Sequence, residues 1–320
     1  MALPMASTTK IMTALLLCEL ADDLSKEIIT THEMVAVEGS SMGLLAGDSV
    51  SYYDLLYGML LASGNDAANT TAIALGGSVK KFVDIMNERA KQLGLVDTHF
   101  VTPSGLDAEG HYTTAYELAL IAKEALSNEQ FALAASSKSA RLCFGNPPYN
   151  RTLTNHNKLL KMYDDIVGVK TGFTKKSGRC LVSASKKDGK CVIAVTLNDG
   201  NDWQDHRTLL DLGLSLIETK QFSYPKGEIK IPTVTGKTVK AEVPSASINV
   251  TENTKINYKI NAPGFLYLPV SNGQKIGEIC YYNGNTLICS KDIVSNTDIK
   301  QKTNKIKLFF EIFKYILSNV

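Results

Sequence analysis

The sequence lacks the patterns that identify metal centres and nucleic-acid-binding proteins. Its five histidines show no H-x-x-x-H or H-E-x-x-H spacing, and its six cysteines include no C-x-x-C pair. A zinc hydrolase and a structural zinc site are therefore not expected. Lys and Arg number 34 against 32 Asp and Glu, so no field of one sign covers the molecule and nucleic acid is not an expected partner. We expect neither a metal nor a cofactor.

Long apolar runs are also missing. No run is long enough to span a bilayer, and residues 1–5 form no secretory signal because no basic stretch precedes an apolar one. Residues 304–320 would form a helix of roughly 25 Å at about 1.5 Å per residue. Its apolar residues fall on one face: Ile306, Phe309, Phe310, Phe313, Ile316 and Leu317. We interpret this helix as a membrane-surface anchor; the alternative is a terminal helix packed on its own domain.

Length and hydrophobic patterning predict two domains. The chain has 320 residues, 44% hydrophobic and 21% charged, which is the composition of a folded protein longer than one average domain. The first part is mostly helical, and Ser7 or Thr8 can cap its first helix. Apolar stripes of helical period predict helices over residues 7–20, 53–62, 65–76, 78–93 and 113–126.

A β-rich pattern follows the helices. Residues 167–174, 179–186 and 190–197 read as strands, and Asp188-Gly189 predicts a hairpin between the last two. A helix over 203–219 comes next. Together these elements predict an α+β domain with helices packed on an antiparallel sheet. The apolar strand 190–197 would lie at the exposed edge of that sheet.

From residue 221 onward, short strands alternate with Gly, Pro and Asn. Strands over residues 229–234, 238–243, 255–260, 275–282 and 286–290 predict a small all-β domain. Cys280 and Cys289 flank the turn signal Asn283-Gly284-Asn285 and would face each other across a Gly284-Asn285 turn. A disulfide between these two cysteines therefore stays open beside two free thiols.

Three short motifs carry candidate chemistry. In Ser7-Thr8-Thr9-Lys10, serine and lysine lie three residues apart on one helical face. A serine hydroxyl needs a base, and a lysine can act as that base when burial or a nearby cation lowers its pKa. Ser63-Gly64-Asn65 taken alone is a loop and helix start. Lys170-Thr171-Gly172 taken alone is a strand whose glycine lets another backbone approach closely.

Taken together, the three motifs resemble the S-x-x-K, S-D-N and K-T-G signature of penicillin-binding proteins and β-lactamases. The S-G-N variant resembles the low-molecular-mass D-alanyl-D-alanine carboxypeptidases of serine peptidase family S11. Residues 2–6 and 11–14 around the first motif, and residues 93–122, resemble that family too. The later β domain and amphipathic tail match its usual layout.

The resemblance implies a fold, an activity and a set of residue roles. The fold would be a transpeptidase-like domain over residues 1–219, an all-β domain over 220–300 and an amphipathic anchor over 301–320. The activity would be removal of the terminal D-alanine from peptidoglycan pentapeptides ending in D-Ala-D-Ala, with β-lactam antibiotics as further ligands. By resemblance Ser7 is the nucleophile, Lys10 its base, Ser63 a proton relay and Asn65 a contact to the substrate amide.

The remaining implied roles concern substrate binding. By resemblance Lys170 and Thr171 of the Lys170-Thr171-Gly172 motif engage the terminal carboxylate, and the backbone N–H groups of Ser7 and Phe173 hold the oxyanion. By resemblance a basic residue in the segment 202–207 would also reach the carboxylate, and Arg207 is the only candidate here.

Other polar and aromatic residues receive structural interpretations. We interpret His99 and His111 as structural hydrogen-bonding residues rather than bases. Trp203, the single tryptophan, is interpreted as packed rather than as a platform for substrate.

One departure bears on localisation. Relatives carry a signal peptide and N-terminal strands before the first motif, whereas six residues precede Ser7 here. We therefore expect a chain truncated upstream. The amphipathic tail and the implied substrate favour an extracytoplasmic, peripheral location on the outer face of the bacterial cytoplasmic membrane. Two alternative functions stay open at this point: a β-lactamase, and a β-lactam-binding sensor or wall-binding protein with impaired turnover.

Overall fold

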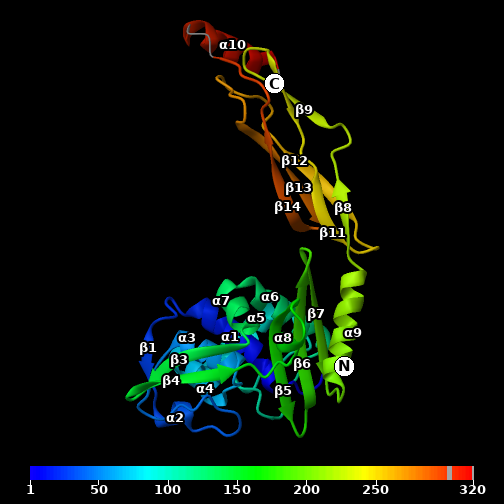
Figure 1. The fold of residues 1–320 in the computed structure, drawn as a ribbon. Coiled ribbons are helices and arrows are strands. Elements are labelled where there is room, and N and C mark those ends of the chain that lie inside the picture. The colour runs from blue at the N-terminus through cyan, green and yellow to red at the C-terminus, as the bar shows by residue number, and fades with distance from the viewer. Residues whose placement is uncertain (301–304, 319–320) are drawn as a thin grey trace. The chain divides into compact units, whose positions relative to one another are not determined.

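The computed structural model describes residues 1–300 and 305–318. The chain divides into two compact units, Met1–Leu214 and Ser215–Val320. The first unit combines helices with two antiparallel sheets, and the second is built mainly of strands (Figure 1). The predicted α+β domain followed by a strand-rich region is confirmed.

Helix α1 (Lys10–Leu20) lies in the middle of the first unit. Its residues from Lys10 to Leu17 are all buried, as expected for a helix surrounded by other elements. It contacts α3 (Tyr52–Leu60), α4 (Asn65–Gly76) and α6 (Ala115–Ser127). Helices α5 (Val79–Gln92) and α7 (Glu129–Ser136) complete this helical layer. The five helices predicted in this part are present, with ends shifted by a few residues.

Three antiparallel strands flank the helices: β5 (Ile166–Thr174), β6 (Gly178–Lys187) and β7 (Lys190–Leu197). The predicted hairpin is confirmed, since Lys187 pairs with Lys190 and both turn residues, Asp188 and Gly189, have positive φ. Strand β7 lies at an edge of this sheet in the described part of the chain. It contacts α6, and most of its residues are half-buried.

A second sheet was not predicted. Strands β1 (Glu27–Ile29), β2 (Ser49–Ser51), β3 (Ser139–Gly145) and β4 (Pro148–Thr154) lie side by side in that order. The short helices α2 (His32–Val35) and α8 (Leu159–Met162) were also not predicted. Strands of three residues offer too few positions for an alternating pattern, which explains why β1 and β2 escape sequence analysis.

The predicted helix over 203–219 is partly wrong. Helix α9 covers Asp202–Ser215, and the chain then continues as strand β8 (Glu218–Phe222), which pairs with β11 (Ala246–Val250). Strand β9 (Glu228–Pro232) pairs with β10 (Thr238–Glu242). Strands β12 (Ile256–Asn261), β13 (Lys275–Asn283) and β14 (Thr286–Val294) form a third sheet, and one apolar core joins these sheets.

The disulfide left open by the sequence does not form, because Cys280 and Cys289 are both free. A register shift between Tyr281 and Tyr282 places Cys289 opposite Tyr281, and Cys280 opposite Ser290. The two thiols therefore project from opposite faces of the hairpin.

The last described element is helix α10 (Lys305–Ser318), which carries most of the predicted terminal helix. Residues 301–304 and 319–320 of that prediction lie outside the described residues. No helix in residues 1–300 or 305–318 has the length and apolar character needed to cross a membrane.

Candidate active site

Ser7 lies on a short 3-10 turn, η1 (Ala6–Thr9), that leads directly into α1. The hydroxyls of Thr8 and Thr9 donate to the carbonyls of Met5 and Ala6 at 2.5 and 2.8 Å. Neither Ser7 nor Thr8 caps α1, so the predicted cap is wrong: the hydroxyl of Thr8 holds the turn. The Ser7 side chain is thereby left to face a cavity.

Lys10 is fully buried and lies directly behind Ser7. Its Nζ is 3.0 Å from Ser7 Oγ, 2.7 Å from Asn65 Oδ1 and 2.6 Å from the carbonyl oxygen of Ser104. An ammonium group donates three hydrogen bonds, so every hydrogen of a charged Lys10 has an acceptor. A neutral Lys10 keeps two of these bonds and presents its lone pair to the Ser7 hydroxyl.

The electrostatic surroundings favour the neutral form of Lys10. Burial lowers its pKa well below the usual value for lysine, the charge of Lys170 lowers it further, and Asp66 opposes these effects. A neutral amine is the form that can accept a proton from serine. The structure thus places a potential base within hydrogen-bond distance of a potential nucleophile.

The S-G-N motif joins the end of α3 to the start of α4. Ser63 has a φ of +59°, a left-handed backbone conformation that is costly for residues other than glycine. Asn65 anchors the segment before it: its Nδ2 donates to the carbonyl of Glu38 at 2.6 Å, and its backbone N–H donates to the carbonyl of Ser40 at 2.7 Å. These contacts aim Asn65 Oδ1 at Lys10 and leave Ser63 at the cavity.

Strand β5 carries the third motif past the turn that bears Ser7. A Cβ built on Gly172 would lie 3.0 Å from the backbone nitrogen of Thr8 and 3.1 Å from that of Ser7. A Cβ at this position would crowd the backbone of the turn, so glycine gives β5 its close approach, as the sequence motif suggested. Lys170 is buried, its Nζ donates to the carbonyl of Thr171 at 2.9 Å, and burial lowers its pKa to about 7.

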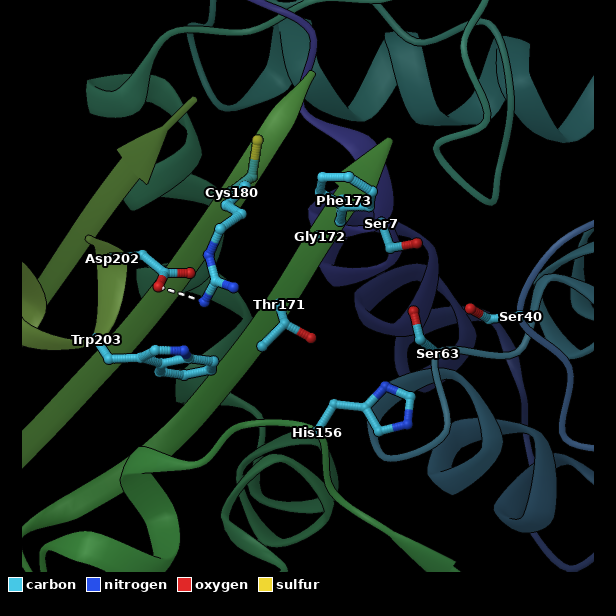
Figure 2. Close-up of a pocket in the computed structure, with 11 residues that line it drawn as sticks. Ser7, Ser40, Ser63, His156, Thr171, Gly172, Phe173, Cys180, Asp202 and Trp203 are labelled. Carbon is cyan, nitrogen blue, oxygen red and sulfur yellow. Dashed lines mark hydrogen bonds and ion pairs between the residues drawn. The ribbon is translucent and has the colours of Figure 1, made fainter. Parts of the chain in front are cut away.

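A cavity of about 480 Å³ opens above these elements. Figure 2 shows Ser7, Ser40 and Ser63 on one side, Asp202 and Trp203 on the other, and Thr171 between them. The complete lining is Ser7, Ser40, Ser63, His156, Thr171, Gly172, Phe173, Arg179, Cys180, Asp202 and Trp203. Among the residues predicted for the site, Ser7, Ser63, Thr171, Gly172 and Phe173 line the cavity. Lys10 and Asn65 lie behind Ser7, and Lys170 is buried in β5.

Trp203 packs against an apolar cluster that includes Leu159 and Leu210, as interpreted from the sequence, and its half-buried ring also lines the cavity. The expectation for Arg207 needs correction. Arg207 does not line the cavity. Its guanidinium forms ion pairs with the carboxylates of Asp165, at 3.0 Å, and Asp211.

The basic residue that does line the cavity is Arg179, which sequence analysis missed. It lies on β6 opposite Phe173, and directly opposed residues project from the same face of a sheet, but the sequence alone does not give this pairing. Ser40 and His156 were also missed. They come from loops whose course no local pattern reveals.

The predicted structural role of His99 and His111 agrees with their contacts. His111 Nε2 is 2.8 Å from the hydroxyl of Thr9, and its Nδ1 accepts the backbone N–H of Val101 at 2.9 Å. Burial lowers the pKa of His111 to about 4, so it is a neutral brace beside the turn that carries Ser7. His99 Nδ1 is 2.7 Å from the carbonyl of Gly110.

A serine beside a buried lysine at the base of a cavity is the arrangement of a hydrolase that works through a covalent acyl intermediate. Comparisons with known proteins agree. A sequence model of the D-alanyl-D-alanine carboxypeptidase family, Peptidase S11, matches residues 1–201. The chain therefore belongs to this family of serine peptidases.

Three relatives illustrate the match. The chain is 31% identical over 311 residues to the D-alanyl-D-alanine carboxypeptidase DacF of Bacillus subtilis, covering 92% of this chain and 79% of that protein. The crystal structure of the D-alanyl-D-alanine carboxypeptidase DacD from Francisella tularensis has a TM-score of 0.65 and 25% identity, covering 94% and 89%. The Streptomyces K15 DD-transpeptidase has a TM-score of 0.64 and 31% identity, covering 68% and 89%.

Proposed function

We propose that this protein removes the terminal D-alanine from peptidoglycan stem peptides that end in D-Ala-D-Ala, through an acyl-enzyme on Ser7. Membership of the family supports the reaction class. The observation that carries the assignment of residues is the 3.0 Å contact between Ser7 Oγ, at the cavity, and Nζ of the fully buried Lys10.

In the first step neutral Lys10 takes the Ser7 proton while Ser7 Oγ bonds to the carbonyl carbon of the penultimate D-alanine. Negative charge develops on the carbonyl oxygen, and the backbone N–H groups of Ser7 and Phe173 are the proposed donors to it. The close approach of Gly172 to the backbone of Ser7 supports this pairing, because it brings the two N–H groups to the same part of the cavity.

In the second step the peptide C–N bond breaks and the terminal D-alanine leaves as an amine. Lys10 holds the proton that the amine requires, and Ser63 is the proposed relay between them, since its side chain lines the same cavity. Asn65 keeps Lys10 in place through the 2.7 Å contact. Lys170 and Thr171 are the proposed partners of the terminal carboxylate. Water then releases the shortened peptide from Ser7.

A β-lactam would enter by the same first step. Ser7 opens the lactam ring, and no amine departs because the broken C–N bond lies within the ligand. Labelled penicillin and a peptide ending in D-Ala-D-Ala therefore test the proposal together. We expect a penicillin adduct that decays slowly, D-alanine release from the peptide, and loss of both in Ser7→Ala.

Other outcomes would replace the proposal. Fast penicillin turnover would indicate a β-lactamase, and a stable adduct without peptide cleavage would indicate a sensor. An adduct that persists in Ser7→Ala would refute the role of Ser7. Ser127→Ala is a matched control, because Ser127 is an exposed serine at the end of α6 and does not line the cavity.

We further propose that residues 1–219 form the catalytic domain, 220–300 a β domain, and 301–320 an anchor on the outer face of the cytoplasmic membrane. Support comes from α10, whose Phe309, Phe310 and Phe313 side chains are 54–65% exposed. Aromatic rings exposed on one helix suit the interfacial region of a bilayer. In the second unit, Phe265 contacts Tyr315 of α10.

Vesicle flotation tests the anchor. We expect the protein to float with vesicles of phosphatidylglycerol and phosphatidylethanolamine, and the double variant Phe309→Ser, Phe313→Ser to stay at the bottom of the gradient. Leu287→Ser is the control, because Leu287 is a similarly exposed apolar residue of β14. Equal flotation of the double variant and the wild type would contradict the assignment.

A further inference from the structure

A loop of the second unit exposes uncharged side chains. Residues 260–274 include no Asp, Glu, Lys or Arg. Surface loops are ordinarily rich in polar turn residues, because their backbone and side chains face water. Here the Tyr267 side chain is 61% exposed, and residues 262–264 are exposed as well. We call residues 262–274 the uncharged loop.

Backbone hydrogen bonds fix the side of this loop that faces water. Leu266 is 8% exposed and packs in the apolar core of the second unit. Its N–H donates to the carbonyl of Pro232 at 2.9 Å, and its carbonyl accepts the N–H of Val234 at 3.1 Å. Neighbouring residues of an extended segment project to opposite sides. Because Leu266 points inward, Phe265 and Tyr267 project from the outer side.

Aromatic contacts join the uncharged loop to α10. The ring centre of Phe265 lies 5.2 Å from that of Tyr267 and 5.8 Å from that of Tyr315 in α10. Tyr315 is half-buried, whereas Phe309 and Phe313 are 65% and 54% exposed. Helix α10 thus turns one side toward the loop and an aromatic side toward solvent. Figure 1 shows α10 beyond one end of the strands of the second unit.

The segments that contact the uncharged loop carry exposed lysines. They come from the turn between β9 and β10, from the segment after β14 and from α10: Lys237, Lys300 and Lys314. Asp298 lies in the same region, and its carboxylate accepts the backbone N–H of Asn272 at 2.8 Å. Aromatic rings that sit at the level of the headgroups, and lysines attracted to anionic lipids, are the features by which proteins bind a bilayer surface.

We propose that Phe265 and Tyr267 of the uncharged loop enter the interfacial region of an anionic bilayer beside α10, as a second membrane contact. This inference rests on the proposed anchor. A single helix that lies on a membrane leaves the domain attached to it free to tilt. The loop belongs to the β domain, so its contact fixes the orientation of that domain on the membrane, and two contacts on one body bind more strongly than one.

A fluorescent residue at position 267 tests the proposal. Trp203 is the single tryptophan, so Trp203→Phe gives a chain without tryptophan emission. Adding Tyr267→Trp to that chain places the only indole in the uncharged loop. With vesicles of phosphatidylglycerol and phosphatidylethanolamine we expect its emission to shift to shorter wavelength, and lipids brominated in their acyl chains should quench it. Tyr116→Trp in the same chain is the control, because Tyr116 is a 74% exposed residue of α6 in the first unit.

The contribution of the loop to binding is measured by titrating vesicles. In Tyr267→Ser we expect the apparent affinity for the anionic vesicles to fall about 5-fold, which corresponds to about 1 kcal/mol. Tyr116→Ser is the matched control and should bind as the wild type does.

An emission from position 267 that stays unshifted while the same variant floats with vesicles would overturn this inference and leave the proposed anchor intact. A shift that appears without vesicles and grows with protein concentration would indicate contact between two copies of the chain, and would overturn it as well. Failure of the wild-type protein to float would instead refute the proposed anchor.

Discussion

The carboxylate of Asp66, next to the S-G-N motif, holds the loop before it, and Asp66→Asn should disrupt this loop. Asp66 is 2% exposed. Its Oδ2 accepts from the Ser41 hydroxyl and from the backbone N–H groups of Gly43 and Leu44. Its Oδ1 accepts from the N–H groups of Met42 and Ala67. The carboxylate therefore organises the loop whose Glu38 and Ser40 carbonyls hold Asn65.

The cost of the substitution can be worked out from these contacts. An asparagine has one acceptor oxygen. In the orientation that keeps the larger number of bonds, this oxygen takes the place of Oδ2 and accepts its three bonds. The two backbone N–H groups that Oδ1 accepted then face an NH₂ group. Leaving a buried donor unpaired costs about 1–3 kcal/mol, so two unpaired donors should cost about 2–6 kcal/mol. For a unit of this size the corresponding fall in Tm is roughly 4–24 °C.

A second effect concerns the pH dependence of acylation. Asp66 raises the pKa of Lys10, so removing its charge lowers that pKa further. Lys10 must be neutral to take the Ser7 proton, and its protonation produces the acid limb of the rate profile. The acid limb should therefore move to lower pH in Asp66→Asn.

Thermal unfolding and the pH profile of penicillin acylation measure the two effects separately. Asp84→Asn serves as the control, since Asp84 is an exposed residue of α5 with the same charge. A Tm equal to that of the control would refute the hydrogen-bond argument. An acid limb that stays in place, or moves to higher pH, would refute the electrostatic argument.

Two further predictions concern the turn that bears Ser7 and the buried lysine of β5. Gly105→Ala should abolish penicillin acylation, because a Cβ there would lie 1.9 Å from the carbonyl oxygen of Ala6. Gly94→Ala is the control: Gly94 has a similar positive φ, but no described atom lies within 4 Å of the added Cβ, so this variant should retain acylation at the wild-type rate. The kcat/KM for D-Ala-D-Ala peptides should decline as pH rises through about 7, because Lys170 then loses the charge that attracts the carboxylate; a profile that keeps rising to pH 9 (roughly two units above that pKa) would contradict this role.

Local spacing predicted that Ser7 and Lys10 lie together, and their side chains are 3.0 Å apart. Ser7 and Lys10 lie three residues apart along the chain, so helical geometry alone brings them to one face. The third acceptor of Lys10, the Ser104 carbonyl, lies 94 residues away, and the course of its loop depends on tertiary packing. Gly105 shows the same dependence, because its need for glycine comes from a contact with Ala6 that no local pattern records.

Strand register limited the remaining predictions. The strands around Arg179 were predicted, but their pairing was not, so its position opposite Phe173 could not be used. The Cys280 and Cys289 pair failed for the same physical reason, since one register shift moves every later residue to a new partner. Strand existence follows from composition and alternation, whereas register depends on turns, bulges and packing.

The missing side chain at Gly172 has a consequence for substrate choice. Because β5 rests directly on the backbone of Ser7 and Thr8, the strand has no room to slide along the turn. Ser7 and Thr171 thus stand at a set spacing. Under the proposed roles, this spacing measures the distance between the bond that is cut and the end of the peptide, and a peptide with one extra backbone atom after the scissile bond would place its carboxylate beyond Thr171.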